Sequence, residues 1–224
     1  MSQTGKKEDI KVFADTCAFS RSVYLHFKTL FETSTDEDRA RMARAAETLF
    51  GDLHKILVEY IILQICKITD PAQDFKKNDN HTVAFLLQHY GVMGDPQIGQ
   101  RLTELDQKTQ AFRQKLLPAR NKLISHADRA AILAGNTLGG APQADWDQFW
   151  LDLEELVNII HERVTGEQFK VTEIGMLTDA DGLLKALHHA EHFDQLLSDK
   201  TPNVAKRAAE VAFSYPTQVQ GPQS

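Results

Sequence analysis

A chain of 224 residues can hold one large domain or two small ones, and its composition is that of an ordinary globular protein. No apolar run approaches the ~18 residues that cross a bilayer, and the first ten residues lead into no apolar stretch, so we expect neither a membrane protein nor a secreted one. The formal net charge of −6 excludes a general nucleic-acid binder, which needs a basic surface. We therefore predict a cytoplasmic protein without a membrane partner, whose contacts with any RNA are local.

The first third of the chain has the apolar spacing of two long helices. Apolar residues over 13–31 recur at steps of three and four, which predicts an amphipathic helix over about 7–32. Ser34 and Glu37 have the spacing of a capping box, which satisfies the free amide groups at a helix start. A second helix is therefore expected to begin near residue 36.

Proline and glycine divide the middle of the chain. Apolar residues lie nearly all round the second helix over 60–68, so this half should lie at the centre of a bundle, and the Asp-Pro pair at 70–71 should end it. A short helix is expected over 82–90. The Asp-Pro pair at 95–96 should cap another long helix, which Pro118 is expected to interrupt.

The last third of the chain contains two further helical patterns. Glycine and proline over 127–145 predict a connection, and the apolar spacing of 146–164 predicts a helix after it. A last helix is expected over about 179–198. We therefore predict an all-α, antiparallel helical bundle with an extra C-terminal helix, formed by residues 1–200, whereas 201–224 should be a short helical turn and a disordered tail.

The most distinctive polar cluster is Arg120 and Asn121, followed by His126 and Asp128, within an apolar helical pattern. One interpretation is structural: Arg120 pairs with an acid, Asn121 caps a helix that restarts after Pro118, and His126 ends that helix. The other is chemical, because histidine and arginine can supply a proton acceptor and a phosphate-binding cation near neutral pH.

The sequence RNKLISHAD at 120–128, together with FGDLHKILVEYIILQICKITDP in the second helix, resembles the AbiU-like, abortive-infection branch of the HEPN superfamily. The resemblance covers roughly residues 10–165. It implies a HEPN-type helical bundle, and in RNA-cleaving members an arginine precedes a histidine by this spacing, as Arg120 precedes His126 here. HEPN toxins that pair with nucleotidyltransferase antitoxins carry a tyrosine where this chain has Asp128, so the resemblance does not imply that partnership.

The resemblance assigns roles in metal-independent RNA cleavage. His126 would be the base or acid acting on the ribose 2′-hydroxyl, which DNA lacks, and Arg120 would bind the phosphate. Asn121 would position the phosphate or the backbone. Apart from the resemblance, Glu59 lies beside the apolar stripe of the second helix and could pair with Arg120 inside the bundle, a structural role more than a catalytic one. Glu59 and Asp128 are therefore expected to support the site. No cofactor or metal is required.

The spacing of the motif bears on assembly. On a straight helix, six residues separate Arg120 and His126 by ~120° around the axis and ~9 Å along it, so the two side chains are not a ready-made pair. The family's behaviour implies a composite site where two subunits meet across a two-fold axis. Apolar stripes on several helices also exceed what one small bundle interior requires. We therefore predict a homodimer.

Other candidate sites are weaker. His188 and His192 have a spacing that can ligate zinc, with His189 between them, but no further ligand set completes a site, so we predict a solvated helix face and no metal. Cys17 and Cys66 lie in apolar helical patterns and should be buried thiols.

The function most consistent with these observations is an endoribonuclease that acts as a toxin or phage-defence effector, with RNA as substrate and an antitoxin or regulatory protein as a further partner. The alternative is a non-enzymatic HEPN module that binds a partner protein or a nucleotide-like ligand, which the acidic net charge favours. A third class, a purely structural helical dimer, would make Arg120 and His126 dispensable.

Overall fold

A computed structural model describes residues 3–91, 95–121, 140–169 and 179–198 of the chain. In these ranges all the extended regular elements are helices, and the only β-type pairing is a single isolated bridge. The elements are α1 (Gln3–Phe27), the π-helix η1 (Lys28–Glu32), α2 (Asp36–Ile68), α3 (Val83–Tyr90), α4 (Pro96–Ala119), α6 (Gln143–Thr165) and α7 (Asp179–Ser198).

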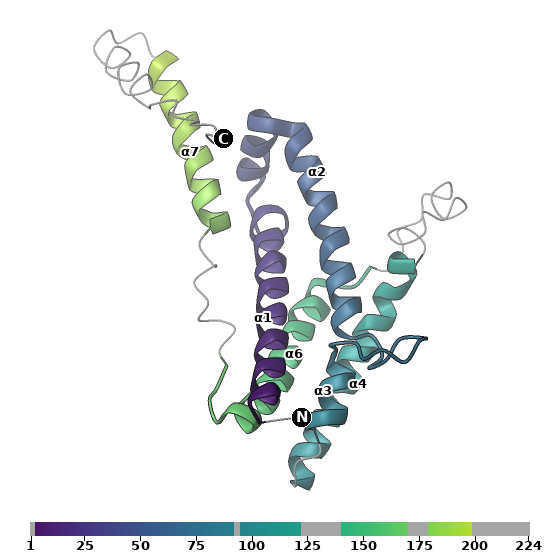
Figure 1. The fold of residues 1–224 in the computed structure, drawn as a ribbon. Helices are drawn as coiled ribbons and strands as arrows, with labels where there is room; N and C mark the ends of the chain where they lie inside the picture. The colour runs from purple at the N-terminus through teal and green to yellow at the C-terminus, as the bar shows by residue number, and fades with distance from the viewer. Residues whose placement is uncertain (1–2, 92–94, 122–139, 170–178, 199–224) are drawn as a thin grey trace, which may run out of the picture.

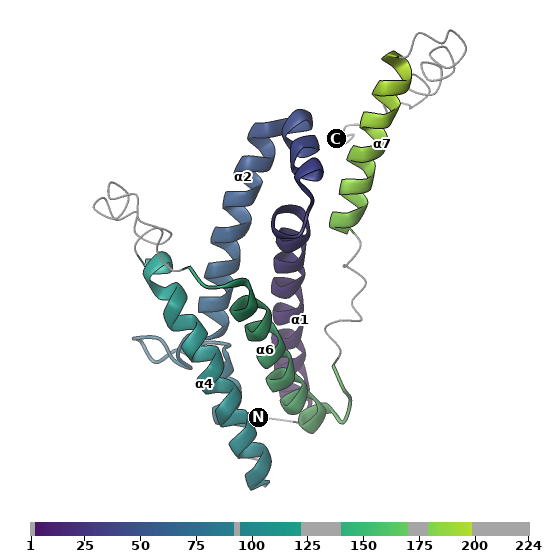
Figure 2. The ribbon, with the colours of Figure 1, turned by 180° about the vertical axis from the view of Figure 1, so that it is seen from behind.

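The helices α1, α2, α4 and α6 pack as an antiparallel bundle, which α3 covers at one end (Figures 1 and 2). Their apolar stripes meet in one continuous core, because each stripe follows the 3.6-residue period of the helix. Fully buried members from all four helices include Phe13, Ile65, Leu116 and Leu156. The predicted all-α bundle is therefore confirmed.

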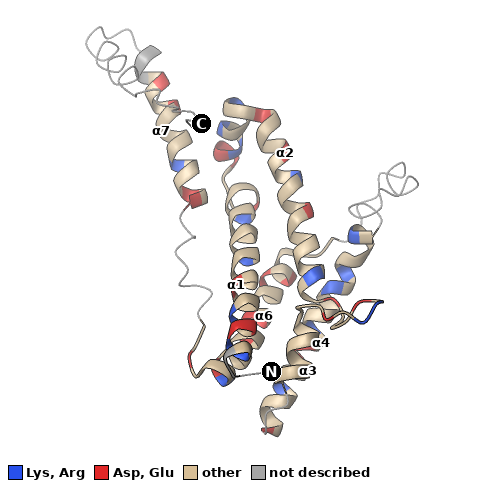
Figure 3. Cartoon of the chain, viewed as in Figure 1, with Lys and Arg blue, Asp and Glu red and all other residues tan. Residues whose placement is uncertain are grey.

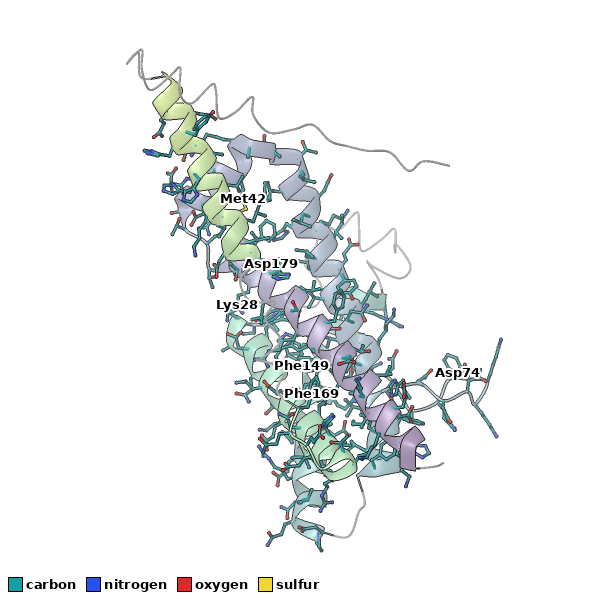
Figure 4. The ribbon with its side chains drawn as sticks, turned by 60° about the vertical axis from the view of Figure 1, so that its left-hand side comes forward. Lys28, Met42, Asp74, Phe149, Phe169 and Asp179 are labelled. Atoms are coloured by element: carbon teal, nitrogen blue, oxygen red, sulfur yellow. The ribbon has the colours of Figure 1, made fainter. Side chains whose placement is uncertain are left out.

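The last helix, α7, packs outside this bundle against the first part of α2 and against η1 (Figure 1). A separate, small apolar cluster joins them, with Leu30, Met42 and Ala180 buried at its centre. Figure 4 shows Met42 beside α7, above the bundle that contains Phe149. The extra C-terminal helix thus has a small core of its own.

The start of α2 corrects one expectation. The capping box lies one residue later than Ser34 and Glu37: Thr35 accepts a hydrogen bond from the backbone N–H of Asp38, whose side chain accepts one from the Thr35 backbone N–H. Ser34 is buried, and its hydroxyl donates to the carbonyl oxygen of Leu30. Ser34 and Thr35 each carry a hydroxyl that can cap a helix. Because Ser34 is buried and its hydroxyl is bonded to Leu30, Thr35 takes the capping position.

Other helix ends agree with the predictions. Thr82 caps α3, and Asp95 caps α4 with Pro96 in the first turn. Gly166 ends α6 with φ of 82°, a left-handed conformation that glycine adopts without steric cost. The helix expected over 7–32 begins earlier, and its last turn is the π-helix η1, which apolar spacing does not distinguish from an α-turn.

Within α2, Ala46 has non-helical backbone angles. Figure 1 shows that the ribbon of α2 bends sharply in its first part. Among the described residues no helix is long and apolar enough to cross a membrane. The expected boundary at residue 200 lies outside the described residues, as do residues 201–224.

Candidate functional site

Arg120 and Asn121 lie at the C-terminal end of α4, on the side of the bundle from which the loop after α2 also projects (Figures 1 and 2). Arg120 is half-buried, and its Nη1 donates a hydrogen bond of 2.9 Å to Oδ1 of Asn121. Asn121 therefore orients the guanidinium, and the remaining donors of Arg120 point to no carboxylate among the described residues.

The helix does not break at Pro118, contrary to the expectation. It runs to Ala119, and the backbone N–H of Arg120, in the right-handed helical region, donates to the carbonyl oxygens of Leu116 and Leu117. Pro118 removes a single N–H donor at an exposed position in the last turn, so the neighbouring bonds hold the helix. No helix restart precedes Asn121, whose side chain instead accepts from Arg120.

Arg120 differs from the other arginines that the structure describes. Each of the others has a carboxylate oxygen within 4.0 Å; their partners are Arg21–Glu154, Arg39–Asp36, Arg41–Glu191, Arg44–Glu37, Arg101–Glu155, Arg113–Asp70 and Arg163–Asp95. Within the described part of the chain Arg120 has no such partner. Its guanidinium thus keeps donors for a ligand.

The surroundings of Arg120 are locally basic. Arg113, two turns earlier on α4, pairs with Asp70 at the end of α2. Burial raises the pKa of the Cys66 thiol, while the positive charges of Arg113 and Arg120 act in the opposite direction. Lys67, the residue after Cys66, is exposed, and Figure 3 shows blue residues on α4 and the adjoining end of α2. An acidic protein thus has a local positive region at this site.

The other residues of the predicted site are placed only in part. Glu59 is half-buried on α2, two helical turns before Cys66 and on the same face. The ion pairs found among the described residues include none between Glu59 and Arg120. His126 and Asp128 lie outside the described residues.

A second polar cluster was not found by sequence reasoning. The hydroxyl of Tyr24 donates to Oδ1 of Asp147 at 2.7 Å, and Nζ of Lys28 donates to the same atom at 2.7 Å. Gln143 donates to the Tyr24 hydroxyl at 2.6 Å, and the ring of Trp146 stacks on that of Tyr24 with centroids 6.2 Å apart. Burial, and then the carboxylate of Asp147, raise the pKa of Tyr24.

This cluster borders a cavity of about 230 Å³ between α1, η1, α2 and the start of α6. Tyr24, on α1, and Lys28, on the π-helix that continues it, are four residues apart, and Gln143 and Asp147 are four apart on α6. In the sequence each pair therefore resembles an ordinary solvated helix face. Only the packing of α6 against α1 brings the two pairs together. A π-helical turn next to a cavity is a feature often found at functional sites.

The histidines of α7 do not form a metal site in the described part of the chain. His188 and His192 are exposed, and Glu191 beside them is held by Arg41 and Arg44. No group of three or more histidine, cysteine or acidic side chains with metal-binding geometry occurs among the described residues. Cys17 and Cys66 are buried free thiols, as predicted.

Comparison with known proteins finds a family whose sequence model matches this chain. The sequence model of the HEPN family described as AbiU2 matches residues 10–182, which extends the resemblance seen in the sequence beyond residue 165 to the first turn of α7. Comparisons with curated proteins and with solved structures give no significant match. The matched region includes Arg120, Asn121 and His126 and covers most of the chain, so the chain belongs to the AbiU2 family of HEPN proteins.

Proposed function

We propose that this protein is a metal-independent endoribonuclease whose site contains Arg120, Asn121 and His126. The observation that carries the proposal is that Arg120 has no carboxylate partner among the described residues, whereas the other described arginines all bind carboxylates. Membership of a HEPN family is compatible with the same reaction. In this proposal His126, six residues after Arg120, is its catalytic partner.

In this proposal, His126 takes the proton of a ribose 2′-hydroxyl, and the oxygen attacks the adjacent phosphorus. The bond from phosphorus to the 5′-oxygen breaks, and the leaving oxygen takes a proton from a second acid. The products are a 2′,3′-cyclic phosphate and a 5′-hydroxyl end. Arg120 binds the non-bridging oxygens as negative charge grows on them, and Asn121 fixes the orientation of its guanidinium. Glu59 and Asp128 would support these groups.

The second acid is best supplied by a second subunit, because one motif holds a single histidine. An apolar strip on the outside of α1 and α2 supports a homodimer: Leu49 and Ile56 are 63% and 60% exposed, and Tyr60 meets the 53% exposed Phe19 edge to face. Leu49 and Ile56 are seven residues apart and share a face of α2. A strip of this kind is typical of a surface that another chain covers.

The proposal is tested by incubating the protein with a single-stranded RNA and with the matching DNA in the presence of a chelator. The wild type should cut only the RNA and leave 2′,3′-cyclic phosphate ends. His126→Ala should lose ~10²–10⁴-fold in rate, which is the usual contribution of a general base. His192→Ala, at an exposed histidine of α7, is the matched control and should cut at the wild-type rate.

Loss of cleavage in His126→Ala with unchanged thermal unfolding supports the catalytic role. Equal cleavage by both histidine variants would refute it. Sedimentation should give a dimer at micromolar concentration, and a monomer that still cleaves RNA would remove the composite site.

In the cell we propose that the enzyme acts as a toxin or phage-defence effector, held inactive by an antitoxin or regulatory protein. Expression of the wild type should arrest growth, and expression of His126→Ala should not. Equal growth with both proteins would argue against the effector role.

The cavity beside Tyr24 favours a second candidate, a module that binds a nucleotide-like ligand without cutting RNA. Trp146 lines this cavity and is one of two tryptophans in the chain, so its fluorescence should report a ligand there. A saturable fluorescence change with a nucleotide, lost in Gln143→Ala, together with no RNA cleavage, would support this candidate over the enzyme.

A further inference from the structure

The loop that follows α2, residues 71–80, is held in a defined shape by its own hydrogen bonds. The carboxylate of Asp74 accepts from the backbone N–H groups of Lys76 and Asn78 at 2.7 and 2.9 Å, and from Nδ2 of Asn78 at 2.9 Å. A β-bridge joins Gln73 to Asp79 at the base of the loop. Figure 4 shows the loop, with Asp74 labelled, projecting from the bundle.

The tip of this loop consists of an aromatic ring and two lysines. Phe75 is fully exposed, with a relative accessibility of 109%, the highest of the exposed large apolar residues. Lys76 and Lys77 are exposed, and Lys77 adopts φ of 63°, which turns the chain sharply at the tip. A fully exposed phenylalanine on an ordered loop gains nothing from folding, since its ring contacts no core.

The loop lies on the Arg120 side of the molecule. The ion pair from Asp70 to Arg113 ties the start of the loop to α4, and Gln110 of α4 donates to the carbonyl oxygen of Thr69 at 3.0 Å. The two opposite views agree that the loop and the end of α4 project on the same side (Figures 1 and 2). Lys67, one turn before the loop, is also exposed.

We infer that Phe75, Lys76 and Lys77 form a contact site for single-stranded RNA, next to the proposed cleavage site. This inference rests on the proposed function, because the RNA is the same molecule. Phe75 stacks on an unpaired base, and the two lysines contact the neighbouring phosphates. An aromatic ring beside positive charges is the combination with which proteins bind single strands without reading their sequence.

The acidic residues of the loop are bonded to other groups and not to the two lysine side chains. Asp70 pairs with Arg113, and Asp79 accepts from Nε2 of Gln73 at 2.9 Å. The pKa of Asp74 is lowered by its hydrogen bonds to Asn78 and Lys76, so it stays ionised as the internal support of the tip. The lysine side chains have no carboxylate partner in the described part of the chain.

The test measures binding separately from cleavage. A fluorescent single-stranded RNA is titrated into the His126→Ala protein, and anisotropy gives Kd at several salt concentrations. Adding Phe75→Ala should weaken binding by about 5- to 100-fold, the range of a lost base stack. Phe75→Tyr should restore it. Single-stranded RNA should bind more tightly than the same sequence as a duplex, because a duplex offers no unstacked base.

The contribution of Lys76 and Lys77 is tested through the salt dependence of the Kd for RNA. Lys76→Gln with Lys77→Asn removes both charges, and asparagine tolerates the left-handed backbone of position 77. The slope of log Kd against log salt should fall by about 1.4, for two phosphate contacts with a single strand. Lys11→Gln with Lys185→Gln, two exposed lysines on α1 and α7, is the charge-matched control and should leave the slope unchanged.

Failure of this inference differs from failure of the proposed function. If the wild type cleaves RNA and the loop variants keep both Kd and KM, the loop is not an RNA site although the enzyme is one. If no form cleaves RNA but the loop variants lose binding, the RNA contact stands and the nuclease does not. If the loop variants dissociate the dimer and bind RNA normally, the loop is a protein interface and the inference is wrong.

Discussion

Two regions of this molecule present arginines on neighbouring helices, and they use them differently. At the start of α2, Arg41 and Arg44 both bind Glu191 of α7, and each has a further acidic partner on α2 itself. At the end of α4, Arg120 binds only the side-chain oxygen of Asn121 within the described residues. The first region joins two helices, whereas the second has a cation without a carboxylate partner in the described part of the chain.

The difference follows from what lies opposite each arginine. Glu191 faces α2 because the apolar cluster of Met42 and Ala180 sets the rotation of α7. Arg120 lies instead near a buried thiol and a second arginine, neither of which can neutralise it. Pairing, rather than the number of positive residues, therefore separates a structural cation from a candidate functional one.

The largest expected effect is on activity. Arg120→Ala should reduce RNA cleavage by about 10²–10³-fold, the loss typical of removing a charge-stabilising donor. Arg44→Ala should leave the rate unchanged, because its donors are committed to Glu37 and Glu191. Single-turnover rates with saturating RNA, measured alongside thermal unfolding, check both.

A conservative variant sharpens this result. Arg120→Lys keeps the charge but loses the planar fork, so its rate should fall between those of the wild type and Arg120→Ala. If Arg120→Ala instead lowers the melting temperature by several degrees at an unchanged rate, Arg120 belongs with the structural arginines.

The sequence predicted the helices well because their signals are local. The caps Thr82 and Asp95 and the terminating Gly166 act through their own backbone neighbours, so they can be read from a few consecutive residues. The capping box at Thr35 was misplaced by one residue because the burial of Ser34 depends on packing. The turn type of η1 and the bend at Ala46 have no sequence signal of this kind.

The residues of the candidate site could be predicted from the sequence, but their neighbours in the fold could not. Arg120 and Asn121 were found by their spacing to His126, yet which described acids lie near Arg120 depends on α2 and α4 packing together. The continuation of α4 through Pro118 likewise depends on that proline being exposed in the last turn. The cluster of Tyr24 and Asp147 joins residues 123 positions apart and could not be predicted.

A smaller effect is expected on stability, and it differs between the two regions. Leu116, one turn before Arg120, is fully buried in the main core, so Leu116→Ala should cost about 2–5 kcal/mol of unfolding free energy. Leu187 is only partly buried in the small cluster under α7, so Leu187→Ala should cost about 1 kcal/mol. Urea unfolding compares them, and equal costs would mean that α7 belongs to the same cooperative core.

The smallest effect concerns the pH dependence of the α2–α7 contact. Hydrogen bonds from Arg41 and Arg44 hold the pKa of Glu191 below its ordinary value of 4.5. A lowered pKa in the folded state means that the contact stabilises the protein above pH 4.5, and that this contribution is lost as the pH falls through the lowered value. At pH 7, Glu191→Gln should therefore lower the melting temperature slightly, by about 1–3 °C for an exposed pair.

The difference between Glu191→Gln and the wild type should disappear in acid, where the wild-type carboxylate is protonated, and it should shrink at high salt. Glu47→Gln, at an exposed position of α2 without an ion pair among the described residues, controls for the loss of a negative charge and should show neither trend. A difference that persists after the wild-type carboxylate is protonated would mean that Glu191 acts by packing. Arg41 and Arg44 would then no longer serve as the example of carboxylate-bound arginines with which Arg120 is compared. The ion pair of Arg113 with Asp70 would take their place in that comparison.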